Sequence, residues 1–91
     1  MGIINQYRLV VTSLDNEMGS KRFKRYFYFP KNEIGLNQMN ERFLEWEKIV
    51  HSDLYNLSGK KDTSYYLTTE SFKRVEDGTE MSTEIESKRV K

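Results

Sequence analysis

The sequence predicts an α+β domain in which a small antiparallel sheet carries one long amphipathic helix on one face. Two stretches with alternating apolar and polar residues come first, and a stretch with helical periodicity follows them. A Tyr- and Thr-rich stretch typical of a strand comes after the helix. The predicted order is therefore β-β-α-β, with one more strand at the C-terminal end as an open alternative.

The first two strands are expected to form a β-hairpin. Residues 3–14 place Tyr7, Leu9 and Val11 on one face, because successive side chains of a strand point to opposite faces. Residues 22–29 alternate in the same way and are rich in aromatic side chains. The stretch between them contains Asp, Asn, Gly and Ser, which are typical of a loop. Pro30 lacks an N–H group and should end the second strand.

The helix is indicated by apolar residues that recur at spacings of three and four. At 100° per residue they fall within an arc of about 80°. They are Leu36, Met39, Phe43, Trp46, Val50, Leu54 and Leu57. We expect a helix over about residues 37–58, with Asn37 as N-cap and Gly59 just beyond the C-terminal end. In the alternative, the pair Ser52-Asp53 breaks this span into two helices.

The chain after the helix predicts a third strand at residues 64–75. Asp77-Gly78 then favours a tight turn, because both residues tolerate positive φ. A fourth strand at 79–86 would place Phe72, Met81 and Ile85 on one face; a disordered polar tail is the competing interpretation. We therefore assign residues 1–76 to a single α+β domain and residues 77–91 to a polar C-terminal segment, either a weak edge strand or a tail.

The order of the strands follows from their connections. The helix carries the chain back along the sheet, so strand 3 runs parallel to strand 2 and antiparallel to strand 1. Strand 1 is the most aliphatic and should lie in the middle, in order 2-1-3. The expected core consists of the helix stripe and seven sheet residues: Tyr7, Leu9, Val11, Phe27, Phe29, Tyr65 and Leu67.

Composition excludes several classes of protein. The 91 residues fit one domain, and 15 basic and 14 acidic residues leave a net charge of +1, which excludes a polybasic binder. No apolar run approaches the roughly 20 residues of a membrane-spanning helix. The chain has no Cys, which excludes disulfide and thiolate-metal scaffolds. We expect a cytoplasmic protein without a membrane partner, and a homodimer as one remedy for the modest stability of so small a domain.

The sequence does not predict an enzyme. His51 is the single histidine, and the chain contains no phosphate-binding loop, dinucleotide-binding or zinc-protease motif. Glu41 and Glu45 form an i,i+4 pair typical of a solvated helix face. A nuclease that uses only Tyr, Lys and Arg is an alternative, but the small bacterial toxins of that kind begin with helices. We expect no metal site and no cofactor.

The most informative stretch is KRFKRYFYF, residues 21–29: four of its first five residues are basic, and aromatic residues follow. Alternation sends Lys24, Tyr26 and Tyr28 to the sheet face away from the helix, beside Arg8 and Tyr66 of the neighbouring strands. The complete candidate binding set shares basic or aromatic character. It consists of Arg8, Lys21, Arg22, Lys24, Arg25, Tyr26, Tyr28 and Tyr66.

Three interpretations of this set stay open. Tyr and Arg are common anchors of protein interfaces, which favours a binding protein. We expect an inhibitor or accessory regulator, of the kind that phages and other mobile elements encode, bound to a larger protein or nucleoprotein machine that handles nucleic acid. The alternative is direct binding of single-stranded RNA or DNA by stacking on the tyrosines. In the third interpretation the tyrosines only pack across the sheet.

Overall fold

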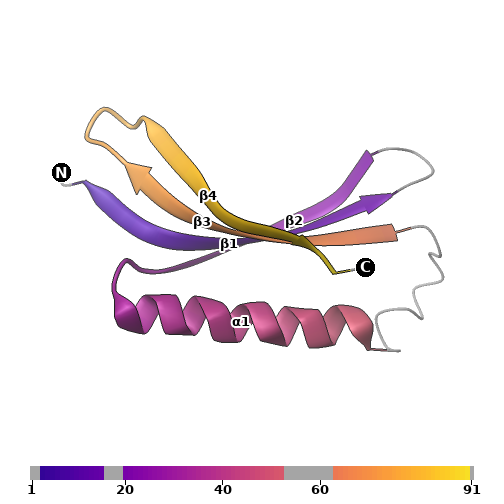
Figure 1. Ribbon diagram of the computed structural model, residues 1–91. Coiled ribbons are helices and arrows are strands. Elements are labelled where there is room, and N and C mark those ends of the chain that lie inside the picture. The colour runs from indigo at the N-terminus through magenta and orange to yellow at the C-terminus, as the bar shows by residue number, and fades with distance from the viewer. Residues whose placement is uncertain (1–2, 16–19, 53–62, 91) are drawn as a thin grey trace.

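The computed structural model describes residues 3–15, 20–52 and 63–90. Four strands form one antiparallel sheet, and one helix lies along one of its faces (Figure 1). This architecture confirms the predicted α+β fold. The elements in chain order are β1 (Ile4–Asp15), β2 (Ser20–Pro30), α1 (Glu33–His51), β3 (Thr63–Arg74) and β4 (Glu80–Arg89).

The strands lie in the order β2-β1-β3-β4, and every neighbouring pair is antiparallel. The expected central position of the first strand is therefore confirmed. Val11 lies opposite Arg25 on β2 and opposite Leu67 on β3. This register decides which side chains meet on each face.

The core lies between the sheet and α1. Leu9, Val11 and Leu67 are fully buried, and the helix contributes Met39 and Val50. Phe29, Trp46, Tyr65 and Val90 complete the buried cluster, and Tyr7, Phe27, Leu36 and Phe43 pack against it partly buried. All seven sheet residues expected in the core thus belong to it or line it. Sequence analysis missed Val90.

The helix begins earlier than expected. Asn32, not Asn37, is the N-cap, and its side-chain oxygen accepts a 2.8 Å hydrogen bond from the Gly35 N–H. The prediction was wrong because the apolar stripe begins only at Leu36. The spacing of apolar residues therefore gives no sign of the first turn of the helix. That first turn packs directly on the end of β2, where Gly35 is buried against Pro30.

The helix ends at His51. Ser52 adopts an extended conformation, and both its N–H and its hydroxyl donate hydrogen bonds to the Ile49 carbonyl, at 3.1 and 2.8 Å. The helix therefore stops at the alternative break point Ser52-Asp53, and the rest of the predicted span to residue 58 lies outside the described residues. Leu54, Leu57 and Gly59 lie outside the described residues.

The fourth strand is present, and its side chains are exposed throughout. Its register differs from the expected one: Phe72 lies opposite Ser82, so Met81 points to the other face. The register shifts at Thr69 and Glu70, which pair with Glu86 and Glu84, so Ile85 is the extra residue of a bulge. Phe72, Met81 and Ile85 therefore do not form the single apolar face that was expected.

The end of β4 is held by one buried side chain. Val90 follows the strand, and its N–H donates a 2.8 Å hydrogen bond to the Tyr65 carbonyl. Its side chain joins the core cluster beneath the sheet. Lys88 adds a 2.9 Å ion pair with Glu47 of α1. The C-terminal segment is thus continuous with the domain core through residue 90.

Within the described ranges, no helix has both the length and the apolar character needed to cross a membrane.

Candidate functional site

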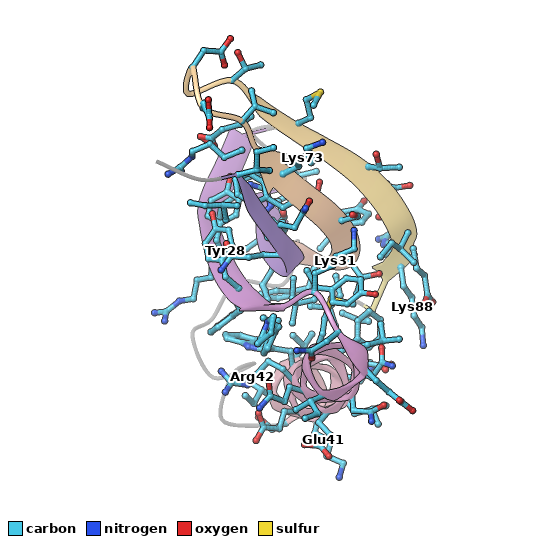
Figure 2. The ribbon with its side chains drawn as sticks, turned by 90° about the vertical axis from the view of Figure 1, so that its left-hand side faces the viewer. Tyr28, Lys31, Glu41, Arg42, Lys73 and Lys88 are labelled. Carbon is cyan, nitrogen blue, oxygen red and sulfur yellow. The ribbon has the colours of Figure 1, made fainter. Side chains whose placement is uncertain are left out.

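The face of the sheet away from α1, hereafter the open face, carries the even-numbered side chains of β1 and their cross-strand neighbours. In its central row Tyr28, Arg8, Glu70 and Glu84 lie side by side on the four strands. Adjacent rows contain Tyr26, Val10, Thr68 and Ser87, then Lys24, Thr12, Tyr66 and Arg89. The helix covers only the opposite face (Figure 2).

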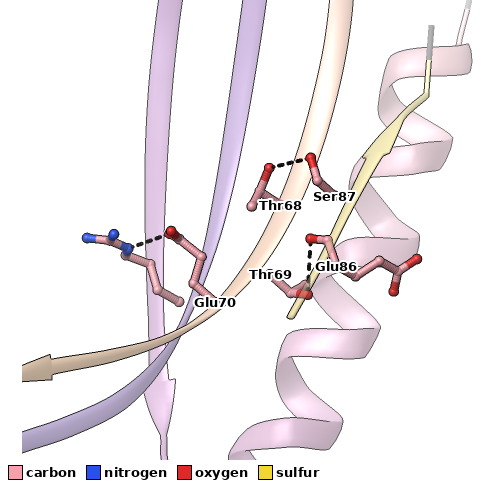
Figure 3. A network of polar contacts seen from close by, with 6 residues as sticks. Thr68, Thr69, Glu70, Glu86 and Ser87 are labelled. Atoms are coloured by element: carbon pink, nitrogen blue, oxygen red, sulfur yellow. Dashed lines mark hydrogen bonds and ion pairs between the residues drawn. The ribbon is translucent and has the colours of Figure 1, made fainter. Parts of the chain in front are cut away.

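Arg8 occupies the centre of the open face. Its Nε donates a 2.8 Å hydrogen bond to Oε1 of Glu70, and the two side chains are only 15% and 14% exposed (Figure 3). Its guanidinium carbon lies 4.7 Å from the ring centre of Phe72 and 5.2 Å from that of Tyr26. Arg8 is therefore held between two rings and one carboxylate, a geometry in which the cation–π attraction and the ion pair act together.

The pKa of Arg8 reflects this setting. Partial burial lowers it, but hydrogen bonds to Glu70 and Tyr28 and their charges together outweigh that effect and raise the pKa above its ordinary value. The neighbours of Arg8 therefore favour its charged form. It acts as a fixed structural cation between β1, β2 and β3.

An apolar layer lies beneath these polar groups. Phe72 is 2% exposed and Val10 is also buried, although α1 is on the other side of the sheet. Tyr28 covers Phe72 edge-on with ring centres 5.5 Å apart, and the guanidinium of Arg74 lies 6.0 Å from the same ring. The open face thus has its own small packed cluster, which orients the rings above it.

Tyr26 and Tyr28 remain available to a ligand. They are 45% and 47% exposed and lie two residues apart on β2, which is an edge strand. Lys24 is exposed in the same line, with its Nζ 6.0 Å from the Tyr26 ring. Two amphipathic rings and one cation therefore stand along one margin of the open face, supported from behind by Arg8 and Phe72.

The structure brings together part of the predicted site. Lys24, Tyr26 and Tyr28 are exposed neighbours on the open face, and Arg8 lies among them as a half-buried support. Tyr66 is half-buried two strands away from Lys24, between Thr12 and Arg89.

Arg25 is not part of this surface. It pairs with Val11, whose side chain lies in the core beneath the sheet, so Arg25 points to the helix side. Lys21 and Arg22 are residues of β2, but their side chains lie outside the described part of the structure.

Two contributors were missed by sequence analysis. Glu70 neutralises Arg8, and β4 adds Glu84 opposite Glu70. Phe72, a residue of the predicted third strand, forms the apolar base of this face. Between β3 and β4 the hydroxyls of Thr68 and Ser87 lie 3.0 Å apart (Figure 3). The alternating pattern of residues 64–75 could also have placed Glu70 on this face, but its partner Arg8 depends on the register.

The charges of the open face nearly cancel. Among the described side chains on this face, four are basic and three are acidic. The basic ones are Arg8, Lys24, Arg74 and Arg89, and the acidic ones are Glu70, Glu80 and Glu84. Arg74 and Glu80 form a 3.6 Å ion pair. The described side chains of this surface therefore carry a nearly balanced mixture of charges and do not form a strongly basic patch.

No group of His, Asp and Glu side chains in the described ranges is arranged to hold a metal ion. His51 is exposed at the last residue of α1.

Comparison of the chain with protein-family models, with curated proteins and with solved structures gives no match.

Proposed function

We propose that the chain is a non-enzymatic binding protein whose open face docks on a larger protein or nucleoprotein machine. In this proposal it acts in the cytoplasm as an inhibitor or accessory regulator of machinery that handles nucleic acid, of the kind that phages and other mobile elements encode. The observation that carries the proposal is the pair of half-exposed rings of Tyr26 and Tyr28, held in place by Arg8 and Phe72.

Preorganisation supports a docking role for these rings. Tyrosine has two side-chain torsions, so little conformational entropy is lost when it is immobilised in an interface. Contacts with Arg8 and Phe72 already restrict both rings in the free chain. Rigid aromatic anchors of this kind supply most of the binding energy in protein interfaces.

The charge balance favours a protein over a nucleic acid as the ligand. Affinity for phosphates grows with the number of cations that are free to neutralise them. On the open face, however, Arg8 is paired with Glu70 and Arg74 with Glu80. A partner with mixed polar and apolar groups matches this surface better than a polyanion does.

Single-stranded RNA or DNA is the second candidate, because Tyr26 and Tyr28 present two exposed rings with Lys24 beside them. Bases stack on such rings with little sequence preference. This hypothesis requires binding that weakens steeply with salt.

The test is a tagged pull-down from the native host or a close surrogate, with and without nuclease, followed by mass spectrometry. We expect a stoichiometric protein that survives nuclease and is lost with Tyr26→Ala and with Tyr28→Ala. Each substitution should weaken binding of the identified partner about 30-fold, which corresponds to an anchor of about 2 kcal/mol. Leu44→Ala, on the exposed surface of α1, is the matched control and should retain the partner.

Two results would contradict the proposal. Retention of the partner by both tyrosine variants would show that the open face is not the contact surface. A high ratio of absorbance at 260 nm to that at 280 nm, with the protein partners lost after nuclease, would favour the nucleic-acid alternative. Titration of fluorescent single-stranded oligonucleotides at two salt concentrations would then measure that binding directly.

A further inference from the structure

The outer edge of β2 is strand backbone that the described part of the sheet leaves unpaired. β2 pairs with β1 on one side only, and this register is continuous from Phe23 to Pro30. The register shift of the pair lies beside Arg22, outside that stretch. Along an edge strand, N–H and C=O groups point outward and can pair with another strand. Residues 23–30 therefore offer a regular template for strand addition.

The other edge of the sheet is less suited to pairing. β4 contains a bulge at Ile85, which disrupts its ladder and bends the strand. Bulges are one of the devices that keep edge strands from pairing with another chain. The two edges thus differ, and β2 is the one that has a regular stretch.

Two cations lie next to each other on the regular stretch of β2. Lys24 and Arg25 are both exposed, with Lys24 on the open face and Arg25 on the helix side. Among the described side chains, neither of them forms an ion pair. Other cations have a carboxylate partner at 2.8 to 3.6 Å: Arg8, Arg42, Arg74 and Lys88. The charges of Lys24 and Arg25 are therefore available to a ligand.

The side of α1 forms a second layer of the same flank. The Arg42 guanidinium lies 5.1 Å from the Phe27 ring centre and forms a 3.0 Å ion pair with Glu45. Around it runs a shallow groove of about 410 Å³, lined by Phe29, Gln38, Glu41, Arg42 and Glu45. Figure 2 shows Arg42 on the same side of the molecule as Tyr28, and Lys88 on the other side. The groove leaves room for a side chain beside Phe29.

We propose that the edge of β2 binds an extended acidic segment of the partner protein, which adds to the sheet antiparallel to β2. Carboxylates of this segment lie opposite Lys24 and Arg25, and an apolar side chain lies opposite Phe29. The inference deepens the proposed function and rests on it, because Tyr26 and Tyr28 belong to the same strand.

Strand addition uses both features of this flank. In this mode of recognition, backbone hydrogen bonds supply affinity and pockets for alternate side chains supply specificity. The side chains of the added strand alternate between its two faces. One set extends the open face beside Lys24, Tyr26 and Tyr28. The other set lies on the helix side, where the groove beside Phe29 accepts one apolar side chain.

Lys24 and Arg25 select the charge of the added strand. Opposite charges that pair across strands stabilise a sheet, and like charges destabilise it. The same two cations therefore attract an acidic strand and disfavour the β2 edge of a second copy. At the other end of the stretch, the groove wall contains Glu41 and Glu45, which would repel a further carboxylate. The segment is thus acidic at one end and apolar at the other.

The probe is a synthetic peptide with this pattern, acetylated and amidated: Thr-Val-Thr-Val-Thr-Glu-Glu-Thr. Paired antiparallel with residues 23–30, it sets its two Glu residues opposite Arg25 and Lys24 and its first Val opposite Phe29. NMR of the isotope-labelled full chain follows the titration. We expect saturable shifts along β2 and about tenfold slower hydrogen exchange of the β2 amides that β1 does not bind. The amides of β4 should stay unchanged.

Two control peptides separate strand addition from attraction between charges. One carries N-methyl groups on its odd-numbered amides and the other on its even-numbered amides, so both keep the two carboxylates. Only alternate N–H groups of an added strand face its neighbour. One of the two peptides should therefore bind about tenfold more weakly than the probe, and the other should bind nearly as well.

Charge reversal in the chain tests the role of the two cations. Arg25→Glu and Lys24→Glu each replace an attraction with a repulsion and should each weaken binding of the probe about tenfold. Lys48→Glu makes the same charge change at an exposed position of α1 and should leave binding unchanged.

Three results would overturn the inference. They are the absence of saturable shifts along β2, equal binding of both N-methylated peptides, and an equal effect of Lys48→Glu and Arg25→Glu. A fourth concerns the acidic strand β4 of another copy as the occupant. A mass in solution above the chain mass of 10.9 kDa, restored to that value by Arg25→Glu, would assign the edge to that strand instead.

These results separate the inference from the proposed function. A chain that does not bind the probe but loses its captured partner with Tyr28→Ala would refute the inference and leave the proposed function standing. A chain that binds the probe along β2, but whose captured partners are unaffected by Tyr26→Ala and Tyr28→Ala, would do the reverse.

Discussion

Arg8 and Glu70 form a 2.8 Å ion pair at the centre of a sheet face that no helix covers. They lie directly opposite each other on β1 and β3, and both side chains are largely shielded from water. The shielding comes from the rings of Tyr26 and Phe72 on either side of the guanidinium. A cation and a carboxylate therefore anchor an aromatic cluster that leaves two tyrosines exposed at its edge.

Truncating one partner of this pair should destabilise the fold. Arg8→Ala leaves the Glu70 carboxylate shielded without its cation and exposes Phe72, so we expect the free energy of unfolding to fall by about 2 kcal/mol. Urea unfolding followed by the fluorescence of Trp46, the single tryptophan, measures this change. The double variant Arg8→Met, Glu70→Met replaces both charges with apolar groups and should recover most of the loss. Equal losses in the single and double variants would show that the pair is not coupled.

Gly35 should not tolerate a side chain, although replacing a glycine inside a helix with alanine normally stabilises a protein. A Cβ at this position would lie 1.7 Å from the Pro30 carbonyl oxygen, so the start of α1 would have to move away from β2. We expect Gly35→Ala to lower the free energy of unfolding by about 3 kcal/mol, measured by the same unfolding experiment. Gly78→Ala is the comparison: its φ is +87° with nothing within 4 Å, so it should cost only the backbone strain of about 1 kcal/mol. A stabilised Gly35→Ala variant would contradict the contact with Pro30.

Val90 should control the attachment of β4. Its buried side chain is the one apolar anchor of a strand whose own residues are all exposed. Val90→Ser should therefore reduce the protection of the β4 amides against hydrogen exchange by at least tenfold, while the amides of β1 stay protected. Ile85→Ser, at an exposed position of the same strand, is the control and should leave the protection unchanged. Loss of protection in β1 as well would mean that β4 does not open separately.

The turn between β3 and β4 should weaken in acid. The Thr79 N–H donates a 2.9 Å hydrogen bond to the Asp77 carboxylate, which holds the pKa of Asp77 below its ordinary value of 3.8. A carboxyl group whose pKa is lower in the folded chain adds stability above pH 3.8, and that contribution is lost as the pH falls through the lower folded value. An NMR titration of the Asp77 side chain should show its midpoint below 3.8. In Asp77→Asn the turn should no longer respond to pH over this range. A midpoint of Asp77 at or above 3.8 in the parent chain would show that the hydrogen bond from Thr79 does not lower the pKa.

Much of the fold follows from local patterns. Alternation in residues 3–14 and 22–29 identifies the core positions Leu9, Val11 and Phe29, because each strand residue faces the side opposite to its neighbours. The same alternation predicts the exposed side of Tyr26 and Tyr28. The predicted helix boundaries were less accurate. The helix is capped by polar atoms of Asn32 and Ser52, and the spacing of apolar residues carries no information about them.

The sequence by itself determined the element order, the central position of β1 and the two faces of the sheet, because these depend on the periodicity of short segments and on the direction of their connections. Only the tertiary structure decided which side chains meet across strands distant in the chain. The register set Arg8 opposite Glu70 and Arg25 opposite Val11. It also brought Val90 into the core. Each of these results depends on how whole strands align, and a shift of one residue would move every side chain to the opposite face.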